Sequence, residues 1–167
     1  MVNFGITVGL YDEDNIFEWK CTILGPKDTY YKGGLFYLKI FFPNDYPNSK
    51  PEIVFLTPIY HLNVKYFVST GQPLGHICVN TLNQWNPGDS IKKILPELFT
   101  LMHQNNPDSP YDDGCNSRRN EYVNNRELFK KKQDILQKSM QHLTQKRKNI
   151  QMVGIFLIMT KINFNVS

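Results

Sequence analysis

The sequence predicts an α+β domain in which an antiparallel sheet comes first and helices follow. Short segments in which apolar and polar residues alternate lie in the first third of the chain. In the second half, apolar residues recur every three or four positions, as on one face of a helix. A chain of 167 residues suits one domain with a proper core, and its apolar fraction of 41% argues against disorder.

The strand prediction depends on a period of two residues. Phe17, Trp19, Cys21 and Ile23 alternate with polar residues, as in a half-buried strand. Four strands with short turns are expected, which indicates a four-stranded antiparallel meander. Their ranges are residues 6–10, 16–24, 35–42 and 52–56.

A long loop is expected over residues 57–88, because six prolines and glycines interrupt it and no long period appears. A loop of this length in a compact domain is usually functional. The interrupting residues are Pro58, Gly71, Pro73, Gly75, Pro87 and Gly88.

Helices are expected after this loop. Residues 91–102 carry an apolar stripe that Ser90 could cap, although Pro96 should kink the helix or delay its start. Two further helices are expected over residues 117–123 and 126–143.

We divide the chain into a core domain, residues 1–148, and a tail of uncertain structure, residues 149–167. The apolar run 152–159 is too short for a membrane span, which needs about 20 residues, so a packed or frayed tail is expected, with weak membrane contact as the less favoured alternative. The net charge is +4, and residues 126–148 alone hold eight Lys or Arg against two acidic residues. Such a segment is typical of a solvated helix face, with a landing site for an acidic partner as the alternative. No aromatic platform accompanies it, so nucleic acid is not expected as a partner.

The three cysteines are Cys21, Cys78 and Cys115, an odd number without a CxxC pair, and no signal peptide is evident. This pattern favours free thiols in a reducing compartment, so we expect the cytoplasm, with the nucleus as the alternative. Cys78 alone would be read as a small buried hydrophobe between Ile77 and Val79. Its position in the loop region makes an exposed, reactive thiol the competing interpretation.

Cys78 belongs to a series of nine short motifs that follow one another along the chain. Together they resemble the catalytic core of ubiquitin-conjugating enzymes over about residues 4–132. The motifs are Gly25-Pro26, Tyr31-x-Gly33-Gly34, Phe42-Pro43-x-x-Tyr46-Pro47, Pro51, Phe55-x-Thr57, His61-x-Asn63, Gly75-x-Ile77-Cys78, Trp85-x-Pro87 and Asn106-Pro107-x-Ser109-Pro110.

The resemblance implies an acyl relay without a metal or organic cofactor. An activating enzyme passes the C-terminal carbonyl of ubiquitin to the Cys78 sulfur, and a substrate lysine then attacks the thioester, usually with a ubiquitin ligase present. A thiolate suits this role because it is both a good nucleophile and a good leaving group. Ubiquitin is the default modifier, while SUMO and other ubiquitin-like modifiers remain alternatives.

The same resemblance implies roles for the residues around Cys78. Asn63 matches an asparagine whose amide could stabilise the oxyanion of transfer, or could instead fix its own loop. Ser109 matches a gate position beside the incoming lysine. His61 is expected to order the loop.

The resemblance also implies that further residues pack under the cysteine loop or bind the ligase. Trp85 is expected to pack under the cysteine loop. The loops that meet the ligase would carry Pro47, Asn48 and Pro87, and Asn48 is polar where many relatives have a large apolar anchor.

Four departures from the family pattern stand out. Leu62 replaces the proline of the His-Pro-Asn motif. An insertion over about residues 65–75 could shift Asn63 relative to Cys78, and Pro96 interrupts the following helix. Met1 stands only a few residues before the first strand, so we expect the helix that normally opens the fold to be missing, either because the chain is truncated at its start or because the helix is absent.

Three rival functions follow from these observations. A non-catalytic variant that binds modifier or ligase as an adaptor would fit the missing helix, but such relatives usually lack the cysteine. A cysteine hydrolase would use His61, Asn63 and Cys78, but the chain order differs from the papain-like layout. A zinc site from His61, His76, Cys78 and His103 matches no common zinc spacing.

Overall fold

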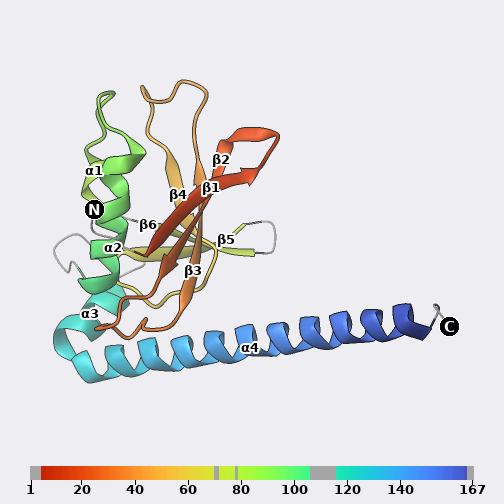
Figure 1. Cartoon of the computed structure of the whole chain (residues 1–167). Helices are drawn as coiled ribbons and strands as arrows, with labels where there is room; N and C mark the ends of the chain where they lie inside the picture. The colour runs from red at the N-terminus through yellow and green to blue at the C-terminus, as the bar shows by residue number, and fades with distance from the viewer. Residues whose placement is uncertain (1–4, 70–71, 78, 106–115, 165–167) are drawn as a thin grey trace.

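The computed structural model describes residues 5–69, 72–77, 79–105 and 116–164. They form an antiparallel sheet of six strands in the order β1-β2-β3-β4-β6-β5, together with four helices (Figure 1). The strands are β1 (Ile6–Asp12), β2 (Asn15–Leu24), β3 (Leu35–Phe41), β4 (Glu52–Phe55), β5 (Val64–Ser69) and β6 (Gln72–Ile77). The four predicted strands are confirmed as β1 to β4, and so is the α+β fold class.

The expectation of one long loop after β4 was wrong. Part of that region folds into the hairpin β5–β6, in which Ser69 pairs with Gln72. Pro73 and Gly75 suggested a loop because both residues interrupt most strands. Pro73 is tolerated because β4 pairs with β6 only at Gly75 and His76, so this part of β6 has β5 as its one partner strand.

The helices are α1 (Asn80–Asn83), α2 (Ile91–His103), α3 (Asn116–Asn124) and α4 (Arg126–Phe164). Three details differ from expectation. The side chain of Ser90 makes no capping hydrogen bond. Helix α2 starts at Ile91 and continues through Pro96, because the apolar face holds it against the sheet. Helix α4 runs to Phe164 instead of ending near Leu143, and it extends well beyond the sheet toward the C-terminus (Figure 1).

The predicted absence of an opening helix concerns residues that are only partly described. The described part of the chain begins at Gly5, and β1 is its first element. Residues 1–4 lie outside the described residues.

The core lies between the sheet and α2. Side chains of β2 and β3, including Cys21 and Leu38, pack with Ile94, Leu98 and Met102 of α2 in one buried cluster. Burial of such side chains removes apolar surface from water and is the main stabilising term.

Helix α4 joins this core through one narrow stripe. Phe129, Gln133 and Gln137 are buried at spacings of four residues, so they share one helix face. The amide of Gln133 donates to the hydroxyl of Tyr31 at 2.7 Å and to the carbonyl of Tyr60 at 3.1 Å. These bonds satisfy the buried amide and fix α4 against the segment that leads into the candidate site.

Replacing Gly25 with alanine should destabilise the fold strongly. A Cβ there would lie 1.8 Å from the carbonyl oxygen of Tyr31, a backbone atom that cannot rotate away. We expect Gly25→Ala to lower the free energy of unfolding by about 3 kcal/mol in urea titrations. Gly9→Ala is the matched control, because a Cβ at Gly9 meets nothing within 4 Å and should change stability by under about 0.5 kcal/mol. Equal losses in both variants would contradict the steric explanation.

Candidate functional site

Two of the predicted site residues, His61 and Asn63, lie at the base of the β5–β6 hairpin. His61, Leu62 and Asn63 lead into β5, and Ile77 ends β6. Cys78 and Ser109 lie outside the described residues, as does Cys115. The site is therefore described from His61, Asn63 and the described residues that contact them.

The strand register brings the two halves of the motif together. In the β5·β6 ladder, Val64 pairs with Ile77. The residue immediately before Val64 is Asn63, and the residue immediately after Ile77 is Cys78. The insertion that separates the two motifs forms the far part of the hairpin, so it does not move apart the chain segments at its base.

His61 is a fully buried residue that uses both of its ring nitrogens. Its Nε2 lies 2.7 Å from the carbonyl oxygen of Leu101 in α2, and its Nδ1 accepts the backbone N–H of Asn63 at 3.0 Å. Because a carbonyl can only accept, Nε2 carries the proton and the ring is neutral. Burial lowers the pKa of His61 from 6.5 to about 4, although the Leu101 carbonyl opposes the shift. These bonds tie the loop to α2 and leave no free nitrogen for acid–base work or for zinc.

Asn63 is also buried, with 1% of its surface exposed. Its backbone is held by His61, so its side chain starts from a fixed point. A fixed amide can donate to a developing oxyanion without reorganising, and it can equally brace the loop. The two roles that the sequence suggested for Asn63 stay predictions.

Arg118 of α3 is a site residue that the sequence did not reveal. Its Nη1 donates to the carbonyl of His61 at 3.0 Å and also to the carbonyl of Val64. It thus bridges the two ends of the segment that contains Asn63. The residues lie more than fifty positions apart, and only the folded chain brings them together.

A second group of side chains holds α3 against the same loop. The hydroxyl of Tyr60 donates to Glu121 at 2.7 Å, and Lys132 of α4 pairs with Glu121 at 2.6 Å. Burial acts to raise the pKa of Glu121, but these two donors outweigh it and lower the pKa. Burial and the bond to Glu121 raise the pKa of Tyr60, so its hydroxyl keeps its proton. Glu121 therefore links α3 and α4 to the residue that precedes His61.

Trp85 joins the two loops that were predicted to meet a ligase. Its indole N–H donates to the carbonyl of Pro47 at 2.8 Å, and its ring lies 5.9 Å from that of Tyr46. Pro47, Asn48 and Pro87 are all exposed. The structure therefore sets Trp85 against the turn around Pro47 and leaves both loops accessible.

Cys21 differs from a reactive thiol. Its side chain is fully buried in β2, and burial raises its pKa to about 12. At neutral pH this thiol stays protonated, and reagents cannot reach it. Its burial agrees with its place on the apolar side of the alternating strand.

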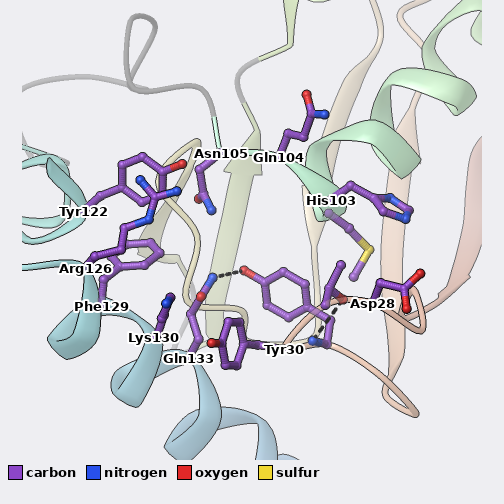
Figure 2. Close-up of a pocket in the computed structure, with 13 residues that line it drawn as sticks. Asp28, Tyr30, His103, Gln104, Asn105, Tyr122, Arg126, Phe129, Lys130 and Gln133 are labelled. Carbon is purple, nitrogen blue, oxygen red and sulfur yellow. Dashed lines mark hydrogen bonds between the residues drawn. The ribbon is translucent and has the colours of Figure 1, made fainter.

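A pocket of about 410 Å³ opens near the site, between the end of α2, the start of α4 and residues 28–31 (Figure 2). Its lining includes Asn105, Tyr122, Arg126 and Gln133, but neither His61 nor Asn63. Over the described residues, no group of His, Cys, Asp and Glu could hold a metal ion. No helix in the same part of the chain is long and apolar enough to cross a membrane.

Comparisons with known proteins agree with this geometry. A family model described as "Ubiquitin-conjugating enzyme" matches residues 2–137. Ubiquitin-conjugating enzyme E2 13 of Arabidopsis thaliana is 34% identical over 142 residues, which are 77% of this chain and 80% of that protein.

Solved structures give the same result. The E2 domain of a Toxoplasma gondii ubiquitin conjugating enzyme matches with a TM-score of 0.66 and 28% identity, over 81% of this chain and 87% of that one. A structure from Plasmodium yoelii, assigned to the ubiquitin-conjugating enzymes, matches with a TM-score of 0.65 and 36% identity over 80% and 81%.

The buried neutral His61 predicts an acid-sensitive fold. The unfolded chain takes up the His61 proton near pH 6.5, but the folded chain resists it down to about pH 4. The stability linked to His61 is therefore complete above pH 6.5 and is lost as the pH falls toward 4, by up to about 3 kcal/mol. Urea unfolding of the parent and of His61→Gln across this range measures it. The parent should lose more stability than the variant, and equal losses would contradict the assignment.

Proposed function

Because the chain belongs to the family of ubiquitin-conjugating enzymes, we propose that it accepts ubiquitin as a thioester on Cys78 and transfers it to a substrate lysine. The observation that supports this best is the pairing of Val64 with Ile77 at the base of the hairpin. This pairing keeps the segment that bears Asn63 beside the segment that leads to Cys78, despite the insertion between them.

The reaction has two steps that differ in difficulty. In charging, the Cys78 thiolate attacks the thioester of the activating enzyme, and that enzyme's cysteine leaves as a thiolate. In transfer, a neutral lysine amine attacks the carbonyl, an amide forms, and the Cys78 sulfur leaves. Charging exchanges one thioester for another and needs little help, whereas transfer builds an oxyanion that gains from a fixed donor. Asn63 is the candidate donor, directly or through its loop.

Ser109 is the candidate for guiding the incoming lysine. A serine hydroxyl can accept a hydrogen bond from an amine, but it carries no full negative charge. Its contribution would therefore be positioning of the nucleophile.

The partners follow from the same two steps. Charging requires a ubiquitin-activating enzyme, and transfer to a protein substrate would use a ligase bound at Pro47, Asn48 and Pro87. Exposure of these three residues and the bond from Trp85 to Pro47 support this surface. No cofactor is required by the proposed chemistry.

Cys78→Ser should change the chemistry of the adduct. The parent should form an adduct with ubiquitin that thiol reductant cleaves, whereas Cys78→Ser should form only an oxyester that survives reductant. Gel electrophoresis with and without reductant, after incubation with activating enzyme, ubiquitin and ATP, distinguishes the two. Cys115→Ser is the control and should charge like the parent. A reductant-sensitive adduct on Cys78→Ser would contradict the assignment.

Asn63→Ala should distinguish formation of the ubiquitin thioester from transfer of ubiquitin to lysine. The variant should charge normally but discharge to free lysine about 100- to 1000-fold more slowly, which is the typical loss for one oxyanion donor. Single-turnover discharge without a ligase measures this rate. Asn48→Ala is a suitable control, because the exposed Asn48 should affect only reactions that include a ligase. Discharge of Asn63→Ala at the parental rate would exclude it as the transfer residue, and failure to charge would make its role structural.

A further inference from the structure

The backbone N–H of Leu62 has a partner that comes from a distant part of the chain. It donates to the side-chain oxygen Oδ1 of Asn105 at 3.1 Å. Asn105 lies two residues beyond the end of α2, forty-three positions from Leu62. In Figure 2 it stands at the rim of the pocket between α2 and α4.

This bond depends on a residue that departs from the family motif. A proline at position 62 would have no N–H to donate, but its ring would fix φ near −65°. Leu62 lacks that restriction and supplies a donor instead. Its side chain is fully buried, so the segment cannot turn its N–H toward water without exposing apolar surface.

The other side-chain hydrogen bonds to the backbone of residues 61–64 involve groups other than the N–H of Leu62. Arg118 holds the carbonyls of His61 and Val64, and the ring of His61 holds the N–H of Asn63. None of these bonds restrains the N–H of Leu62. Without Asn105 this part-buried donor would lose its side-chain acceptor, and leaving such a donor without a partner costs stability.

We propose that Asn105 is a positioning residue for Asn63, and that the bond from Leu62 to Asn105 replaces the restraint that a proline would impose. This inference rests on the proposed function, because Asn63 must matter for transfer. Asn105 acts through the backbone of Leu62, which is bonded directly to Asn63. Its effect should therefore fall on transfer and spare charging, which needs little oxyanion stabilisation.

Two substitutions at position 105 test the bond. Asn105→Leu removes the acceptor at similar size, whereas Asn105→Asp keeps an oxygen at the same place. In single-turnover discharge to free lysine, Asn105→Leu should be about 10- to 100-fold slower than the parent, as expected for a misplacement of about 1 Å. Asn105→Asp should stay within about threefold of the parent, and all three should charge alike.

A double-mutant cycle with Leu62→Pro tests whether the two residues act together. Leu62→Pro removes the donor, so adding Asn105→Leu to it should slow discharge no further. Multiplicative losses in the double variant would overturn the proposal, and so would parental discharge by Asn105→Leu.

Hydrogen exchange gives a readout without enzyme activity and without the proline variant. In Asn105→Leu, the amide of Leu62 should exchange at least about tenfold faster than in the parent, while that of Ile40 in β3 should be unchanged. An unchanged rate at Leu62 would overturn the proposal. A parent that never forms the thioester overturns the proposed function together with the transfer role of Asn105. A parent that charges, beside an Asn105→Leu variant that discharges normally, overturns the role of Asn105 alone.

Discussion

The pairing of Val64 with Ile77 is the constraint on which the site depends. It closes the base of the β5–β6 hairpin. In the sequence, Asn63 directly precedes Val64 and Cys78 directly follows Ile77. An insertion between Asn63 and position 78 could separate the two chain segments. Here the added residues pair with each other as strands, so the extra length is taken up away from the base.

A second constraint fixes the segment that approaches this base. His61 stays neutral in the core, and its two nitrogens bind Leu101 on α2 and the backbone of Asn63. Arg118 bridges His61 and Val64 from α3, while Glu121 and Lys132 secure α3 to α4. Three helices thus hold one short loop, and the loop does not depend on a proline for its shape. Rigid placement of this kind is what stabilising a transition-state charge requires, because the donor is in position before the charge develops.

The sequence predicted the elements whose patterns are local. Alternation identified β1 to β4, and the apolar stripe identified α2, because both signals come from neighbouring residues. The hairpin was missed because Pro73 and Gly75 interrupt its pattern. The length of α4 was missed because the sequence changes from the polar run 144–149 to the apolar run 152–159, without one continuous helical stripe. Nine ordered motifs identified the family, which the comparisons then showed. No pattern could reveal Arg118 or Asn105, since each reaches the loop only through the fold.

Locating the carried modifier on the chain tests the central claim most directly. After charging with activating enzyme, ubiquitin and ATP, a non-reduced proteolytic digest can be read by mass spectrometry for the peptide that retains the C-terminal fragment of ubiquitin. We predict that this fragment lies on the peptide containing Cys78 and disappears after treatment with a thiol. A fragment found on Cys21, on Cys115 or on a lysine, with Cys78 unmodified, would contradict the proposal that Cys78 carries ubiquitin.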